Sequence, residues 1–135
     1  MNHAEFIQAV AARPGVLPSQ AEPVTRATLE ALAERISGGQ ARDLAAQLPD
    51  ELRAYVSGPD DDPVPFGLAE FYERIQARAA VNLQTATDGA RAVLDTLRAA
   101  VSEKEYGDFV SQLPKEFWQL TGPATTRLEP GRIGT

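Results

Sequence analysis

Apolar residues recur along this chain at three- and four-residue spacings, the period at which side chains share one face of an α-helix. Leu29, Leu32 and Ile36 follow this spacing, and the segment 94–101 repeats it further along. No window of the sequence shows the alternation of apolar and polar residues that a half-buried strand needs. The pattern therefore predicts an all-α fold.

Turn residues and helix-capping pairs divide this pattern into about eight helices. Prolines and glycines interrupt the first half at 12–16 and 37–39. Four residue pairs have the spacing of a capping box: Asn2 with Glu5, Ser19 with Glu22, Ser37 with Gln40, and Ser102 with Glu105. The expected helices cover 3–12, 19–36, 39–48, 49–57, 67–78, 84–101, 103–112 and 114–120.

The sequence also reads as an internal duplication. A shift of 65 residues aligns 4–53 with 69–118 without a gap, and 17 of the 50 paired positions are identical. A long period that occurs only twice is typical of two fused helical units, because a solenoid needs at least three stacked repeats. We predict two pseudo-equivalent four-helix units, 3–57 and 67–120, packed as one orthogonal bundle in a single domain, 1–121.

Two segments are expected to lie outside the helices. The linker 58–66 is rich in proline and aspartate, residues that favour turns and solvent. Its aspartates, Asp60, Asp61 and Asp62, lack the alternating ligand spacing of an EF-hand loop, which favours a solvated linker over a calcium site. The last residues, 122–135, show no apolar period and are expected to form a flexible tail.

One phrase occurs in both halves, as "DLAAQLPDEL" at 43–52 and "DFVSQLPKEF" at 108–117. Proline is tolerated in the first turn of a helix but not in its interior. Pro49 and Pro114 should therefore end one helix and begin the next. The repeated phrase predicts a corner of the scaffold.

The patterns "RATLEALAERISGGQARDLAAQLPDELR" and "ARAVLDTLRAAVSEKEYGDFVSQLPKEFWQL" resemble those of DUF2267, a family of uncharacterised bacterial proteins with two such helical units in tandem. The resemblance covers about 3–120. It implies a small all-α bacterial protein of unknown activity, and it supplies no catalytic residue.

The charge of the chain bears on its partners. A formal net charge of −6 and a pI near 4.8 oppose binding to nucleic acid or to an anionic membrane surface, and no local basic patch offsets them. The N-terminus lacks the pattern of a signal peptide, and the chain has no cysteine. We expect a cytoplasmic protein that binds neither nucleic acid nor a membrane.

Catalytic residues are scarce. Without cysteine, and with His3 as the only histidine, the chain offers no thiolate nucleophile and no histidine within a recognisable catalytic motif. His3 is interpreted as an exposed or capping side chain. The sequence therefore favours a non-enzymatic protein with no metal site and no cofactor.

Six polar residues occupy paired positions in the two halves: Arg26 and Arg91, Asp43 and Asp108, Gln47 and Gln112. One interpretation makes the two arginines ligand-binding residues that hold an anion. The other, which we favour, is structural. In it each arginine pairs with the aspartate of its own unit, and the glutamines satisfy backbone groups at the corners.

Aromatic residues are concentrated in the second half, where Tyr72, Tyr106 and Trp118 replace Ile7, Ala41 and Arg53 of the first. Aromatic side chains are enriched in protein interfaces. One interpretation is that these three meet a protein partner or a second copy of the chain. The other, which we favour for Trp118, is packing against the tail or the other unit. The alternative is a carrier of a small apolar molecule, bound between the two repeats near Arg26 and Arg91.

Overall fold

The computed structural model describes residues 1–56 and 62–121, and the regular structure within them is helical. The elements are α1 (His3–Ala11), α2 (Pro18–Arg35), α3 (Gly38–Ala45), α4 (Asp50–Arg53), η1 (Ala54–Val56), α5 (Leu68–Ala79), α6 (Leu83–Ala100), α7 (Glu103–Val110), η2 (Lys115–Phe117) and α8 (Trp118–Thr121). The predicted all-α class is confirmed. The predicted tail and residues 58–61 of the predicted linker lie outside the described residues.

Side-chain capping fixes the starts of several helices. Asn2 and Glu5 form the expected capping box, with both hydrogen bonds at 2.8 Å. The prediction for Ser19 is wrong, because α2 begins one residue earlier, at Pro18, with Leu17 as its N-cap. Proline suits the first helical position, since the N–H that it lacks would have no partner there.

Both predicted corners are present. Pro49 is the N-cap of α4 and Pro114 is the N-cap of η2, so each proline separates two helices. The guanidinium of Arg53 closes the first corner by donating to the carbonyl oxygens of Ala45 and Leu48, both at 3.1 Å. These bonds satisfy acceptors that the end of a helix leaves without an intrahelical donor.

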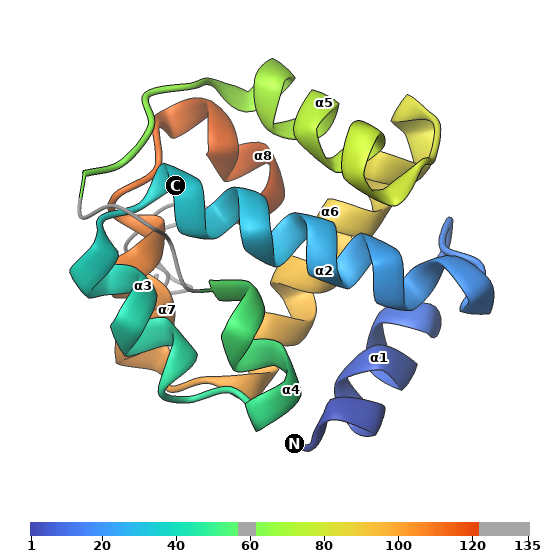
Figure 1. Ribbon diagram of the computed structural model, residues 1–135, viewed down its shortest axis with the longest axis horizontal. Helices are drawn as coiled ribbons and strands as arrows, with labels where there is room; N and C mark the ends of the chain where they lie inside the picture. Colours follow the sequence, from blue (N-terminus) through green and yellow to red (C-terminus); the bar gives the residue numbers. More distant parts are fainter. Residues whose placement is uncertain (57–61, 122–135) are drawn as a thin grey trace, which may run out of the picture.

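The two long helices cross at the centre of the core. In Figure 1, α2 runs across the middle of the molecule and α6 passes behind it. A Cβ atom built on Gly89 of α6 would lie 2.4 Å from Cγ1 of Val24 in α2. The backbone of α6 can therefore approach α2 this closely only because position 89 has no side chain.

Helix α5 is joined to α2 by ion pairs around Glu34. Its carboxylate accepts from Arg74 at 2.8 Å and from Arg78 at 2.7 Å. Partial burial acts to raise the pKa of Glu34, but the two guanidiniums outweigh it and hold the pKa below its usual value. Arg74 also stacks on the ring of Phe66, 4.2 Å from its centre.

Helices α3 and α7 lie side by side at one end of the bundle (Figure 1) and exchange capping bonds. The backbone N–H of Ser37 donates to Oε1 of Gln112 at 2.8 Å, and that of Ser102 donates to Oε1 of Gln47 at 2.7 Å. Each serine side chain also accepts from the backbone N–H three residues on, as its capping position predicts.

The side chains that would ordinarily complete these two capping boxes turn elsewhere. Gln40 does not reach back to the N–H of Ser37; its amide donates to Glu105 at 2.5 Å. At each helix start, a glutamine from the opposite half of the chain therefore accepts the N–H hydrogen bond that the third residue of a capping box would ordinarily accept. The division of the chain into two repeats is not tested by these contacts and stays a prediction.

Candidate functional site

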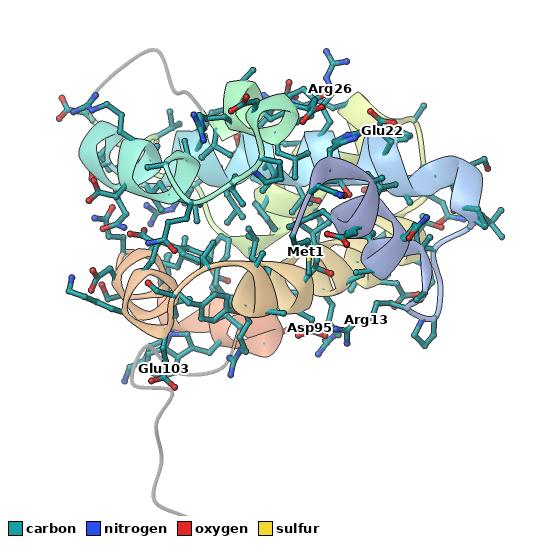
Figure 2. The ribbon with its side chains drawn as sticks, turned by 90° about the horizontal axis from the view of Figure 1, so that it is seen from below. Met1, Arg13, Glu22, Arg26, Asp95 and Glu103 are labelled. Atoms are coloured by element: carbon teal, nitrogen blue, oxygen red, sulfur yellow. The ribbon has the colours of Figure 1, made fainter. Side chains whose placement is uncertain are left out.

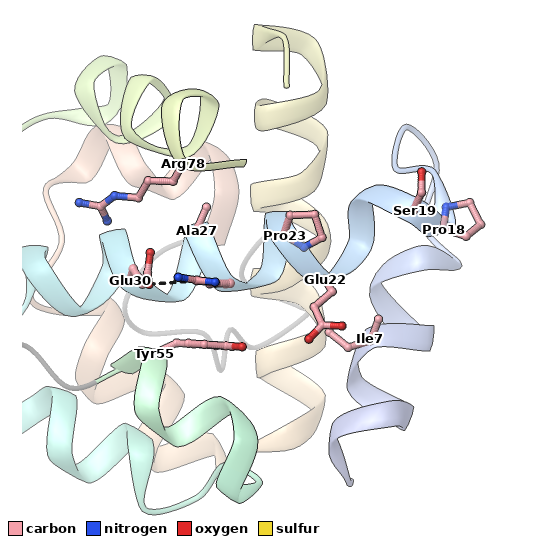
Figure 3. Close-up of a pocket in the computed structure, with 10 residues that line it drawn as sticks. Ile7, Pro18, Ser19, Glu22, Pro23, Ala27, Glu30, Tyr55 and Arg78 are labelled. Carbon is pink, nitrogen blue, oxygen red and sulfur yellow. Dashed lines mark hydrogen bonds and ion pairs between the residues drawn. The ribbon is translucent and has the colours of Figure 1, made fainter. Parts of the chain in front are cut away.

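An open groove of about 590 Å³ follows the exposed side of α2 (Figure 3). Ile7 of α1, Tyr55 of η1 and Arg78 of α5 contribute to its walls, and the rest of the lining comes from α2 between Pro18 and Glu30. Figure 3 shows Tyr55 on one side of α2 and Arg78 on the other. The fold thus brings together residues that are far apart in the sequence.

The guanidiniums of the groove already have carboxylate partners. Nε of Arg26 lies 3.4 Å from Glu30 in the same helix, and the guanidinium lies 5.7 Å from the centre of the Tyr55 ring. Arg78 pairs with Glu34 at 2.7 Å. Because these positive charges are neutralised from within the protein, the groove is poorly suited to an anionic ligand.

Glu22 is the remaining carboxylate of the lining, and its side chain is 55% exposed. Within the described part of the chain, the one basic group within ion-pair distance of the Glu22 carboxylate is Nε2 of His3, 3.5 Å from Oε2. An imidazole is charged only when it is protonated. Figure 2 shows Glu22 and Arg26 on the same side of the molecule, opposite Arg13 and Asp95. His3 itself is not the exposed side chain that the sequence suggested, since only 25% of it is accessible.

The two arginines proposed as ligand-binding residues do not meet in this groove. Arg26 lines it, whereas Arg91 is exposed on α6, where its charge acts on Tyr72. The prediction of interhelical Arg–Asp pairs is wrong as well. Arg26 pairs with Glu30, one turn away in its own helix, and Asp108 pairs with Lys104 at 2.8 Å for the same geometric reason.

The glutamines of the corners behave partly as predicted. Gln47 and Gln112 do satisfy backbone groups, but those of the opposite half of the chain, at Ser102 and Ser37. Their appearance at paired positions is therefore explained by capping, which both halves need, without any ligand.

Tyr106 was expected at a partner surface, and its position contradicts this. The side chain is 1% exposed, packs edge-on against Phe109 with ring centres 5.0 Å apart, and lies beneath the guanidinium of Arg98. Burial raises the pKa of its hydroxyl. Tyr106 is therefore a core residue, and its ring lies between Phe109 of α7 and Arg98 near the end of α6.

Trp118 and Tyr72 are both partly buried against the core. The indole N–H of Trp118 is buried, and Nζ of Lys115 lies 5.7 Å from the centre of its ring. Its counterpart Arg53 donates to two carbonyl oxygens at the first corner, yet 51% of its side chain is exposed. A role for Trp118 or Tyr72 in partner binding stays a prediction.

Acid–base groups do not converge on the groove. Among the described residues, the carboxyl group with a raised pKa is that of Glu105, shifted mainly by burial and further by the carboxylates of Asp43 and Asp108. It lies in the contact between α3 and α7, where it accepts from Gln40, so its environment is explained by packing. Among the described residues no cluster of three or more His, Cys, Asp or Glu side chains could hold a metal ion.

Sequence reasoning identified Arg26 but missed Tyr55, Glu22 and Ile7. Glu22, Arg26 and Glu30 recur every fourth residue, a spacing that places them on one exposed stripe of α2 and could have indicated the groove. Tyr55 gives no such signal, because it reaches α2 only after the chain has turned the corner at Pro49.

None of the helices in the described residues is both long and apolar enough to cross a bilayer.

Comparison with known proteins identifies the family of this chain. A search of curated proteins finds no match. A family model described as "Uncharacterized conserved protein (DUF2267)" matches residues 3–120. That match extends from the first residue of α1 to within one residue of the end of α8. This chain therefore belongs to the DUF2267 family, as its repeated sequence patterns predicted.

Proposed function

We propose that this protein is a non-catalytic interaction module that binds a segment of a partner protein in the groove along α2. The observation that carries the proposal is the shape of the groove: it is open and bordered by four elements. An open channel beside a helix accommodates an extended or helical segment, whereas small ligands are usually enclosed over most of their surface.

The lining supports the same function. Ile7 and Pro23 supply apolar surface. Tyr55 and Arg26 lie against each other in a cation–π contact, with 5.7 Å between the guanidinium and the centre of the ring. A tyrosine and an arginine beside apolar surface are the residue types that dominate binding energy in protein interfaces. The cytoplasmic location and the bacterial origin expected from the sequence stay predictions.

Site-directed photo-crosslinking in the cells that encode the protein tests this proposal. A benzophenone amino acid replaces Tyr55 in one variant and Tyr72 in a matched control, because both are partly buried aromatic residues and only Tyr55 lines the groove. We expect one discrete crosslinked band from position 55 that is several times stronger than any from position 72. Mass spectrometry of the band identifies the partner, or a second copy of the chain.

The opposite result would overturn the proposal. Crosslinking from position 72 without crosslinking from position 55 would move the binding surface to the aromatic half of the chain. Absence of a product from both positions, in a folded protein expressed at its normal level, would also reject the groove as a protein-binding site.

A further inference from the structure

The charges around the groove do not balance, and the imbalance has a single location. Three guanidiniums in this region, those of Arg26, Arg74 and Arg78, face four carboxylates. Glu30, Glu34 and Glu70 each bind at least one of the guanidiniums at 2.7 to 3.4 Å. Glu22 is left without a guanidinium, and the basic group near it is the His3 imidazole, whose Nε2 lies 3.5 Å from its carboxylate.

A second acceptor lies one turn before Glu22. Pro23 is inside α2 and has no N–H, so the carbonyl of Ser19, four residues earlier, lacks its ordinary intrahelical donor. Ser19, Glu22 and Pro23 all line the groove. The Ser19 carbonyl and the Glu22 carboxylate therefore belong to neighbouring lining residues at the α1 end of the groove, and both groups accept hydrogen bonds.

Apolar surface lies beside these acceptors. Ile7 of α1, Pro18 and Pro23 border the same end of the groove, and Figure 3 shows the Glu22 carboxylate next to Ile7. Arginine and lysine need this combination, because their aliphatic stems cover apolar surface while the charged ends require acceptors. Arginine fits best, since its several N–H groups can bind a carboxylate and a carbonyl together.

We infer that the groove recognises a basic protein segment and that an arginine of that segment binds Glu22 and the Ser19 carbonyl. The inference rests on the proposed function and names the chemistry of the partner. The net charge of −6 agrees with it, because the protein as a whole attracts basic segments and repels acidic ones. Arg26 and Arg78 do not oppose it, since each is already neutralised by a carboxylate.

A peptide titration followed by NMR tests the inference without knowledge of the partner. The probes are acetyl-Leu-Arg-Leu-amide and the same peptide with citrulline, which keeps the shape of arginine but carries no charge. We expect the arginine peptide to shift the backbone amide signals of Ile7, Ser19 and Glu22. It should bind about threefold more tightly than the citrulline peptide, the size expected of one partly exposed ion pair.

Two variants locate the effect. Glu22→Gln should abolish the difference between the peptides, while Glu73→Gln, which removes an exposed carboxylate of α5 outside the groove, should preserve it. The NMR spectrum of each variant reports directly whether it is folded. Equal binding of the two peptides, signal changes confined to other surfaces, or an unchanged preference in Glu22→Gln would each overturn the inference.

The two proposals can fail separately. A partner that crosslinks at position 55 equally well in the Glu22→Gln background would retain the interaction module and reject the basic segment. If position 55 gives no crosslinked product in the protein that keeps Glu22, the interaction module itself is rejected, whatever the peptide titration shows.

Discussion

Helices α2 and α6 have the same length, 18 residues each, yet they differ where they touch. Val24 and Gly89 occupy positions related by the 65-residue shift, and they face each other at the crossing. Two valines would compete for one space in a close-packed interior. The difference teaches that the two halves fit together because they are complementary at the contact, even where their sequences are otherwise alike.

The same lesson holds between α3 and α7. Gln40 and Glu105 are also related by the 65-residue shift, and they contact each other. Two glutamates here would repel, whereas a glutamine amide can donate to a single carboxylate. The two halves carry identical residues where the contact is an exchange, as for Gln47 and Gln112, and different residues where a position meets its counterpart, as for Gln40 and Glu105.

The contact between α2 and α6 should be most sensitive to substitution at Gly89. Gly89→Ala should improve helix propensity by about 1 kcal/mol, but overpacking against Val24 should cost about 1–3 kcal/mol. We expect a net loss in the free energy of unfolding, measured by urea denaturation. In a Val24→Ala background the same substitution should become neutral or stabilising. A stabilising effect in the unmodified chain would show that the crossing has room to spare.

The exchanged caps should not be equal in strength. Gln112→Ala should lower the free energy of unfolding by about 1–2 kcal/mol, because the Ser37 N–H that it leaves is partly buried. Gln47→Ala should cost about 0.5–1 kcal/mol, since water can replace its bond to the exposed Ser102. Thermal unfolding and amide hydrogen exchange at the two serines measure both. Equal losses, or the reverse order, would contradict the assignment.

The smallest expected effect concerns Glu105, and it depends on pH. Burial and two nearby carboxylates raise its folded-state pKa, so the carboxyl destabilises the fold as pH rises from its unfolded pKa through its folded pKa. Glu105→Gln should therefore increase stability near pH 7, by less than about 1 kcal/mol after screening by solvent. The gain should vanish near pH 4, where the carboxyl is mostly protonated in both states.

The opposite exchange, glutamine to glutamate at the contacting residue Gln40, is a control for the electrostatic explanation. Gln40→Glu places a second carboxylate beside Glu105 and should destabilise the protein at neutral pH. The opposite contribution of Glu34, whose lowered pKa makes its stabilisation disappear as the solution is acidified, is common to parent and variants and cancels in the differences. A gain for Glu105→Gln that does not change with pH would reject the electrostatic explanation.

The sequence predicts those features that short-range chemistry determines. Asn2 with Glu5, and proline at positions 49 and 114, set helix ends through residues a few positions away, and these ends are where they were expected. Ser19 failed because two local signals competed, and proline at position 18 took the first helical position.

What the sequence could not reveal lies between distant segments. The bonds of Gln47 and Gln112 join residues 55 and 75 positions apart, and no local pattern indicates which N–H a glutamine will find. The groove is similar. Arg26 was singled out because its position is repeated, but its neighbour Tyr55 arrives through the turn of the chain, and Arg91 occupies the paired position without lining the groove.

The exchanged caps also determine how the molecule loses its structure. If the second half of the chain detached, Ser37 would lose the Gln112 acceptor for its N–H, and Ser102 would lose that of Gln47 in the same event. Separation of the halves therefore removes a capping bond from each of them at once, and it also exposes the buried side chains at the crossing of α2 and α6. Heat or denaturant should melt the bundle in one concerted transition, and its kinetics should show no populated half-folded species.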